Sequence, residues 1–201
     1  MAADNDAEIN ERAVSGAELK PAMPAPRDLP AGAAASYRVC LVCLGNICRS
    51  PMAEVILRDE VGRAGLGAQV TVASAGTGDW HLGGPMDARA HKELARRGYD
   101  GSGHVARQIS AAWVDDYDLF VVMDRKNLAN LRRMFADGAA RDRIAMMRSF
   151  DLAAPEGAEV PDPYHGGPKE YEETFDLVLA AARGLTRQLA ARLNDAGMTP
   201  L

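Results

Sequence analysis

Short apolar runs alternate with longer amphipathic segments from residue 37 onward, and this alternation predicts a regular series of strands and helices. Four runs are short and rich in β-branched residues, as is typical of buried strands: Tyr37–Cys43, Val70–Ala75, Tyr117–Met123 and Ile144–Arg148. Four segments place apolar residues on one side of a helix: Ser50–Gly65, Asp87–Arg97, Asp124–Phe135 and Tyr171–Asn194. The proline-rich stretch 151–169 before the last helix predicts a long loop.

Strands that alternate with helices build parallel sheets, because each crossover supplies a helix that covers the sheet. We therefore expect an α/β fold, a doubly wound four-stranded parallel sheet with helices on both faces. Ligands of such sheets bind beyond the carboxyl ends of the strands. The positions to inspect follow Cys43, Ala75, Met123 and Arg148.

Composition divides the 201 residues into two parts. Residues 1–36 are rich in alanine and proline and contain neither an aromatic residue nor a cysteine. These few large apolar groups cannot offset the entropy lost when the chain is ordered. We therefore predict a disordered N-terminal extension over 1–36, with a transient helix near Glu8–Leu19. The alternative is a regulatory or docking arm. Residues 37–201 form a single predicted domain.

Charge and cysteine content argue against several classes of protein. The formal net charge is −5, whereas nucleic-acid-binding surfaces are usually basic. No apolar run approaches the roughly 18 residues of a membrane span, and the first residues lack the order of a signal peptide. Three cysteines do not make a disulfide scaffold. We expect a cytoplasmic monomer that binds neither nucleic acid nor membrane and needs no metal or cofactor.

The segment after the first strand, CLGNICRS over residues 43–50, combines the features of an anion site. A strand-to-helix turn directs backbone N–H groups inward, and the helix N-terminus adds positive potential. Gly45 can adopt conformations closed to other residues, and Asn46 tolerates left-handed geometry. Arg49 can hold two anionic oxygens with its planar fork. These groups would stabilise a thiolate at Cys43, giving a phosphate cradle with a nucleophile at its base.

A lone cysteine at a strand end is more often a small buried hydrophobic residue, and that interpretation suits Cys40 within the strand. It fits Cys43 poorly, because glycine, asparagine, arginine and serine follow where an oxyanion cradle needs them. Ser50 could donate its hydroxyl to the sulfur of Cys43. The chain has neither a lysine-bearing nucleotide loop nor a dinucleotide fingerprint.

The stretch CLGNICRSP over residues 43–51 resembles the signature loop of the low-molecular-weight protein tyrosine phosphatases. Further blocks resemble those of the family in the same order: Ser74–Thr77, Trp80–His81, Asp87–Ala90, His104–Gln108, Met123–Asn127 and Asp162–Tyr164. The resemblance spans about residues 37–194. It implies a cysteine-dependent phosphoric monoester hydrolase that acts on phosphotyrosine and small aryl phosphates through a phosphocysteine intermediate.

The resemblance also implies roles for individual residues. Cys43, Arg49 and Asp162 would be catalytic, with Asp162 as the general acid and later the base, although Asp-Pro pairs elsewhere are usually plain turns. The expected substrate-binding residues are Leu44, Gly45, Asn46, Ile47, Cys48, Ser50, Trp80, His81 and Tyr164. The expected supporting residues are Ser74, His104 and Asp124, of which Asp124 could equally serve as a helix N-cap.

Two positions near the crevice raise separate questions. Cys48 could trap oxidised Cys43 as a reversible disulfide, as the resemblance implies, or it could pack as a buried thiol. His165 stands where family members commonly have the second of two adjacent tyrosines, which makes the entrance more polar. Aromatic walls would accept a phenyl ring and exclude the shorter phosphoserine, whose phosphorus could not reach Cys43.

Related proteins suggest alternative functions. Arsenate reductases need further cysteines to carry a disulfide outward, and no cysteine follows Cys48. Protein arginine phosphatases of the superfamily typically carry threonine where this chain has Ile47. A phosphotyrosine-binding module without activity would have no use for both Cys43 and Asp162. We therefore expect phosphotyrosine-containing proteins as partners.

Overall fold

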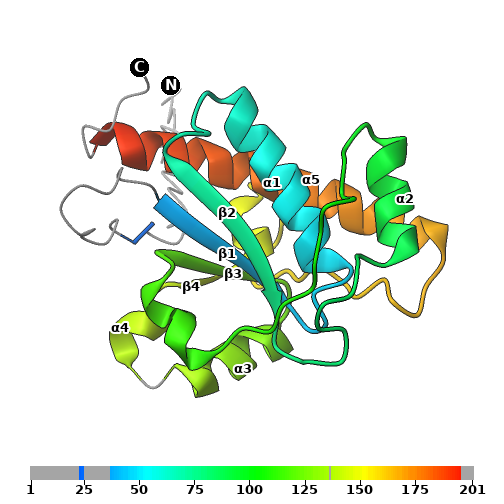
Figure 1. Ribbon diagram of the computed structural model, residues 1–201. Coiled ribbons are helices and arrows are strands. Elements are labelled where there is room, and N and C mark those ends of the chain that lie inside the picture. Colours follow the sequence, from blue (N-terminus) through cyan, green and yellow to red (C-terminus); the bar gives the residue numbers. More distant parts are fainter. Residues whose placement is uncertain (1–22, 25–36, 136, 196–201) are drawn as a thin grey trace, which may run out of the picture.

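Four parallel strands form the centre of this computed structural model, which describes residues 23–24, 37–135 and 137–195 (Figure 1). The strands are β1 (Tyr37–Cys43), β2 (Val70–Gly76), β3 (Leu119–Val122) and β4 (Ile144–Met146). Their order is β2-β1-β3-β4, and every pairing is parallel. The helices are α1 (Arg49–Arg63), α2 (Ala88–Arg96), α3 (Arg125–Met134), α4 (Gly138–Arg141), α5 (Pro168–Asp195), and the 3-10 helices η1 (Ala111–Asp115) and η2 (Met147–Phe150). The predicted doubly wound α/β fold is confirmed.

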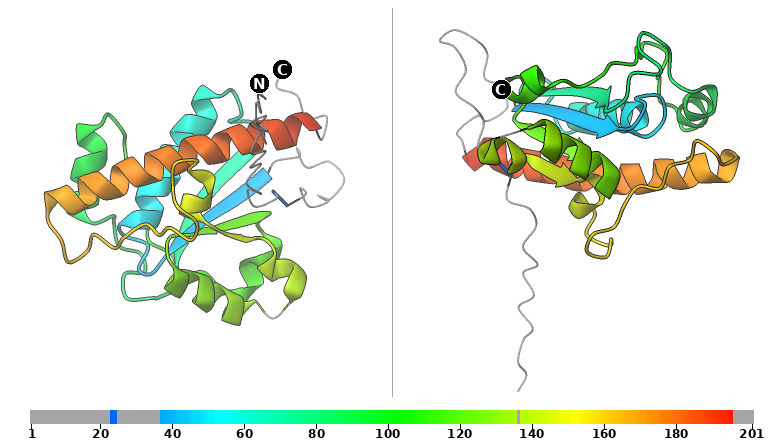
Figure 2. Two further views of the ribbon diagram at one scale, coloured as in Figure 1. Left: turned by 180° about the vertical axis from the view of Figure 1, so that it is seen from behind. Right: turned by 90° about the horizontal axis from the view of Figure 1, so that it is seen from below.

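Each face of the sheet has its own core, because successive side chains of a strand point to opposite faces. Val39 and Leu41 of β1 belong to the larger core, which α1 and α5 cover. Cys40 and Val42 belong to the smaller core, beside α3. Figure 2 shows α5 crossing the larger-core face of the sheet when the molecule is seen from behind. Cys40 is fully buried there, as expected for a packing residue.

The last two strands are shorter than the sequence predicts. β4 ends at Met146, because the chain turns into η2, which buries Met147 and Phe150 against α5. A glycine in α5 permits this contact: a Cβ at Gly184 would lie 1.8 Å from the carbonyl oxygen of Phe150. The apolar run that predicted a strand up to Arg148 thus covers both β4 and the start of η2, because a strand and a helix can each bury apolar residues.

The helix α5 begins three residues earlier than predicted. Pro168 occupies its first position, where a missing N–H costs nothing. The side chain of Glu170 accepts a hydrogen bond from the backbone N–H of Gly167 at 2.7 Å, as in a capping box. These two residues are the start signal that the prediction of a helix from Tyr171 overlooked.

The predicted extension over residues 1–36 lies outside the described residues, apart from Met23 and Pro24, and so does its transient helix near Glu8–Leu19. Met23 packs against the larger core, and the hydroxyl of Tyr37 donates to the carbonyl oxygen of Pro24 at 3.1 Å. None of the described helices is long and apolar enough to cross a membrane.

Candidate active site

The loop of residues 43–50 lies at the carboxyl edge of the sheet, between β1 and α1, and rests against the end of β2. A Cβ at Gly76, the last residue of β2, would lie 2.7 Å from the carbonyl oxygen of Leu44 and 3.0 Å from the nitrogen of Asn46. Glycine therefore permits this close approach. The N–H of Gly78 donates to the carbonyl oxygen of Leu44 at 2.9 Å and joins the two segments.

Asn46 holds the shape of the loop from beneath. Its φ is +54°, the left-handed geometry expected for it, and its side chain is fully buried. The amide Nδ2 donates to the hydroxyls of Ser50 and Ser74, both at 2.9 Å, while Oδ1 accepts from the N–H of Arg107 at 2.8 Å. Its carbonyl oxygen lies 2.7 Å from Nε2 of His104. Asn46 therefore connects α1, β2 and the 104–107 segment.

Gly45 does not have the positive φ that was expected of it, a backbone conformation that residues other than glycine rarely adopt. It is absent from the residues of positive φ among those described, whereas its neighbour Asn46 has that geometry. Space explains the glycine instead, because a Cβ at Gly45 would lie 3.1 Å from Cδ2 of His81. A larger residue at this position would displace the wall of the crevice.

Polar residues behind the loop complete this network. The hydroxyl of Ser74 donates to Oε2 of Glu54 at 2.5 Å, and Arg107 donates to the carbonyl oxygen of Ser74 at 3.1 Å. Burial lowers the pKa of His104 despite the opposing effect of nearby Glu54, so its neutral ring donates through Nε2 to the Asn46 carbonyl. Glu54 and Arg107 were not predicted from sequence, although Arg107 lies in a quoted family block.

The sulfur of Cys43 lies 3.0 Å from the hydroxyl oxygen of Ser50 and is almost fully buried. Ser50 accepts from Asn46, so its single proton is directed either to this sulfur or to the carbonyl oxygen of Ala75 at 3.2 Å. A thiolate at Cys43 would attract that proton. The predicted hydroxyl-to-sulfur contact is therefore present.

The guanidinium of Arg49 is buried between two carboxylates. It donates to Oδ2 of Asp124 at 2.6 Å and to Oδ2 of Asp162 at 2.7 Å. Burial opposes its charge, but the nearby negative groups Cys43, Asp162 and Asp124 outweigh burial and raise the pKa of Arg49. Its Nε is buried and has no hydrogen-bond partner. The side chain is therefore held in place by Nη1 and Nη2 while its Nε–H stays unused.

Asp124 and Asp162 each also accept a hydrogen bond from a backbone N–H two or three residues further along the chain. Asp124 is the N-cap of α3, with Oδ1 accepting from the N–H of Asn127 at 2.7 Å. Both interpretations of Asp124 therefore hold, since its second oxygen braces Arg49. Asp162 accepts from the N–H of Tyr164 at 3.3 Å, and its side chain is 43% exposed. Asp124 is 17% exposed, and of the two carboxylates Asp162 is the one that lines the crevice described next.

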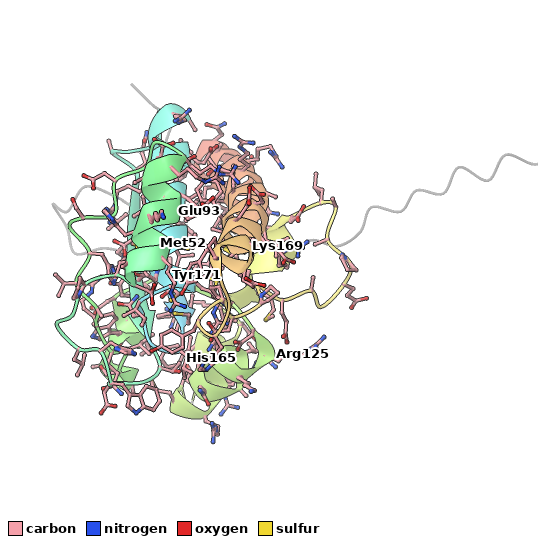
Figure 3. All side chains as sticks on the ribbon, turned by 90° about the vertical axis from the view of Figure 1, so that its right-hand side faces the viewer. Met52, Glu93, Arg125, His165, Lys169 and Tyr171 are labelled. Carbon is pink, nitrogen blue, oxygen red and sulfur yellow. The ribbon has the colours of Figure 1, made fainter. Side chains whose placement is uncertain are left out.

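A crevice of about 280 Å³ opens above these groups. It is lined by Cys43, Leu44, Gly45, Ile47, Cys48, Arg49, Trp80, His81, Asp162, Tyr164 and His165. Of the predicted substrate-binding residues, Asn46 and Ser50 instead lie fully buried outside the wall. His165 was noted only as a departure from the family pattern. Figure 3 labels it on the segment that leads into α5.

Cys48 lines the crevice but is almost fully buried, and it contacts the first turn of α5. Its sulfur lies 3.4 Å from the hydroxyl oxygen of Tyr171. Burial raises the pKa of Cys48 to about 12. At neutral pH it is therefore a thiol that packs within the larger core, as one of the two sequence interpretations expected.

The fold and the site together define a class: α/β proteins in which the first strand delivers a cysteine to an anion-binding loop closed by an arginine. A family model described as low molecular weight phosphotyrosine protein phosphatase matches residues 38–195. A low molecular weight protein-tyrosine-phosphatase of Streptomyces coelicolor is 46% identical over 151 residues, covering 75% of this chain and 92% of that protein. The chain belongs to this family, and it is a hydrolase of the protein-tyrosine-phosphatase class.

Solved structures agree with this assignment. A protein tyrosine phosphatase of Entamoeba histolytica, with Hepes in the active site, matches with a TM-score of 0.73 and 30% identity over 82% of this chain and 100% of that chain. YwlE, an arginine phosphatase from Bacillus subtilis, matches with a TM-score of 0.68 and 27% identity over 76% of this chain and 95% of that chain. The fold therefore accompanies more than one phosphatase activity.

Proposed function

We propose that Cys43, Arg49 and Asp162 carry out the hydrolysis of phosphotyrosine in proteins. In the first step the Cys43 thiolate attacks phosphorus, the bond from phosphorus to the phenolic oxygen breaks, and Asp162 gives its proton to that oxygen. In the second step water attacks the phosphocysteine and transfers a proton to Asp162. The sulfur–phosphorus bond then breaks, which releases phosphate and restores the thiolate.

The unpaired Nε of Arg49 is the observation that carries this proposal. Buried donors are almost always paired, so a buried donor beside a nucleophile and the backbone N–H groups of the loop indicates where an anionic oxygen binds. The equatorial oxygens of the transferring phosphoryl group would lie against these donors in the transition state. Asp124 fixes the guanidinium for this role through a 2.6 Å bond, and Asp124 is not among the residues that line the crevice.

Phosphate and Asp162 compete for Arg49. The Asp162 carboxylate now accepts from Nη2 of Arg49 at 2.7 Å. A phosphate dianion in the cradle is a stronger acceptor for the guanidinium fork. Binding of the substrate would therefore release Asp162, which then takes up a proton from solvent and faces the leaving oxygen as the general acid.

Aromatic and apolar walls favour an aryl phosphate over the alternatives. The rings of Tyr164 and His81 line the crevice with centroids 6.5 Å apart and planes inclined at 51°, and Ile47 contributes an apolar wall. Such a slot suits a flat phenyl ring, whereas a phosphoarginine would bring a charged guanidinium against apolar groups. Arsenate reduction stays disfavoured, because it needs a further cysteine that carries the disulfide outward. The one remaining cysteine of the sequence is Cys40, which is buried in the sheet.

The setting of the enzyme belongs to the same proposal. A cysteine nucleophile needs a reducing compartment, so we place the protein in the cytoplasm, acting as a monomer on phosphotyrosine proteins. In this proposal the phosphatase domain spans residues 37–201, and residues 1–36 are an extension to it, of which Met23 and Pro24 contact the domain.

Substitution of the nucleophile tests the mechanism. Cys43→Ser should abolish turnover but keep the fold and the affinity for inorganic phosphate, because Arg49 and the loop N–H groups remain. We expect less than about a hundredth of the wild-type rate, since removal of a covalent nucleophile usually costs more than that. Calorimetric titration with phosphate measures the second expectation.

A panel of substrates tests the specificity. Wild-type protein and Cys43→Ser are assayed side by side with p-nitrophenyl phosphate, a phosphotyrosine peptide, phosphoarginine and arsenate. We expect phosphotyrosine to be hydrolysed with the highest kcat/KM among the physiological compounds. A higher kcat/KM for phosphoarginine would assign the protein to the alternative function.

A further inference from the structure

The segment of residues 161–167 carries Asp162 and Tyr164 and is called the acid loop below. The first turn of α2 faces it, and one arginine of that turn reaches across. Nη1 of Arg89 donates to the carbonyl oxygen of Gly166 at 3.2 Å. Its guanidinium carbon lies 5.5 Å from the ring centroid of Tyr164. Arg89 therefore contacts both the backbone and a side chain of the acid loop.

A second pair of contacts orients Arg89 itself. Asp87 binds its guanidinium at two points, Nε to Oδ1 at 3.0 Å and Nη2 to Oδ2 at 2.8 Å. The other face of the guanidinium lies over the ring of Tyr171, 4.9 Å from the centroid. Tyr171 is buried between α2 and α5 (Figure 3), and its hydroxyl oxygen contacts the sulfur of Cys48. Cys48 belongs to the loop of residues 43–50, which is called the phosphate-binding loop below because the proposed function places the phosphate there.

Stability alone does not account for this arrangement. The other arginines at the end of α2, Arg96 and Arg97, pair with Glu93 on the same helix and with acidic residues of α5, as a helix-to-helix contact would require. Arg89 is 42% exposed, and exposed ion pairs contribute little to stability. Its planar fork instead connects three elements, which lysine could not do.

We propose that Arg89 is a positioning residue that holds the acid loop at the spacing from the phosphate-binding loop that proton transfer requires. The inference rests on the proposed role of Asp162 as the general acid. The N–H of Gly166 donates to the carbonyl oxygen of Pro163 at 2.8 Å, so residues 163–166 form one turn. Arg89 holds that turn at Tyr164 and at Gly166.

This fixation matters at the moment when substrate binds. Asp162 must give up its bond to Arg49 and form a new one to the phenolic oxygen of the substrate while it stays within the site. Its Oδ1 accepts from the N–H of Tyr164 at 3.3 Å, so the orientation of the carboxyl group follows that of the loop. With the turn held by Arg89, the exchange needs a side-chain rotation alone. Without Arg89 the loop itself would become free to move away.

A leaving-group comparison tests the proposal. Arg89→Met and Arg89→Lys are assayed with phenyl phosphate, whose leaving group needs protonation, and with 2,4-dinitrophenyl phosphate, whose leaving group does not. We expect Arg89→Met to lower kcat/KM, which reports the step in which the phenol leaves, roughly tenfold more for phenyl phosphate than for the dinitrophenyl ester, with an intermediate effect in Arg89→Lys. The inhibition constant of inorganic phosphate should stay within about twofold, since the cradle is untouched.

Two further variants separate positioning from folding. Arg96→Met breaks ion pairs of the same helix, and any loss of activity in this variant should be the same for the two esters. Asp87→Asn keeps an N-cap on α2 but loses the charged pair with Arg89, so it should show a smaller loss in the same direction even if Arg89→Met is unstable. Equal losses on both esters in Arg89→Met, Arg89→Lys and Asp87→Asn would overturn the proposal.

Asp162→Asn distinguishes failure of this inference from failure of the proposed function. If Asp162→Asn itself shows no leaving-group dependence, the assignment of the acid is wrong. If it does, and Arg89→Met does not, only the positioning role is wrong. If both variants lose more activity on phenyl phosphate than on the dinitrophenyl ester, the double variant should show the same difference as Asp162→Asn alone, because Arg89 acts through Asp162. Additive losses would contradict that route.

Discussion

At the scale of single residues, the polar side chains near the phosphate-binding loop each satisfy partners on different elements. Asp124 caps α3 with one oxygen and braces Arg49 with the other. Asn46 uses both ends of its amide and its own carbonyl. Asn46 and Arg49 are buried, so removal of a partner leaves a buried polar group unpaired at a cost of about 1–3 kcal/mol. The loop is therefore rigid before any substrate arrives.

Acidification should weaken this network through His104. Burial lowers the pKa of His104, so the unfolded chain binds a proton at a higher pH than the folded protein does. The stability that neutral His104 contributes is complete above the ordinary value of about 6.5 and is lost as the pH falls through the lowered pKa. His104→Gln keeps a donor for the Asn46 carbonyl but cannot take up a proton.

We therefore expect the melting temperature of wild type to fall more than that of His104→Gln between about pH 7.5 and pH 5.5. His91→Gln, a substitution on α2 outside the network, is the matched control and should behave as wild type. Parallel curves for wild type and His104→Gln would show that folding does not lower the pKa of His104.

Oxidation provides a second test at the residue scale. Peroxide converts the Cys43 thiolate to a sulfenic acid, and attack by the Cys48 sulfur would give a disulfide and water. We predict that dithiothreitol restores activity after peroxide treatment of wild type and largely fails to do so in Cys48→Ser. Cys40→Ala serves as the control for loss of a buried thiol. Equal recovery in Cys48→Ser would leave Cys48 as a packing residue only, in keeping with its raised pKa.

At the scale of elements, close backbone contacts decide where helices pack and where strands end. Gly76 lets the phosphate-binding loop rest on β2, and Gly184 lets α5 rest on η2. In both places the neighbour is a backbone oxygen, which cannot rotate away as a side chain does. The end of β4 at Met146 and the position of α5 are consequences of this packing.

Two glycine substitutions should therefore have opposite effects on stability. Gly184→Ala should destabilise by about 1–3 kcal/mol, because its Cβ would overlap the Phe150 carbonyl oxygen. Gly62→Ala in α1 meets nothing within 4 Å and should stabilise by up to about 1 kcal/mol, because alanine favours the helix. Urea denaturation of both variants measures the difference. A stabilising Gly184→Ala would refute the packing argument.

At the scale of the whole molecule, the site is assembled where the order of the strands reverses. The chain passes from β1 to β2 on one side and then crosses to β3 on the other, so the carboxyl ends of β1 and β3 adjoin at this point. The loop after β1 brings Cys43 and Arg49, the end of β3 brings Asp124, and the long segment after η2 brings Asp162. The opposite edge of the sheet holds Tyr37 with its contact to Pro24.

Truncation tests the independence of the extension from the site. Tyr37 and Cys43 stand at opposite ends of β1, about 20 Å apart at the rise of a strand. Deletion of residues 1–36 should therefore leave kcat/KM for a small aryl phosphate within about twofold. The melting temperature should fall slightly in this variant, because Met23 and Pro24 are lost, and should stay unchanged when only residues 1–22 are deleted. A large loss of activity in either variant would identify a functional arm.

Local patterns in the sequence determined the strands, most helices and the loop that carries Cys43 and Arg49. This succeeded because apolar runs and turn residues act over a few positions, and because the loop residues are contiguous. The first strand matches its predicted bounds, Tyr37–Cys43, for this reason. Asp162 also followed from resemblance to the family, since a short motif carries it.

Only the tertiary structure decided which distant groups meet at the loop. Glu54 reaches Ser74, Arg107 reaches Asn46, and Arg89 reaches the acid loop across 77 positions of chain. No local pattern encodes these contacts, because they depend on how α1, α2 and α5 pack on the sheet. The same holds for Gly45, whose need for space arises from His81, a residue on a different loop. Packing therefore converts a recognisable cysteine loop into a site with a braced arginine and a held acid.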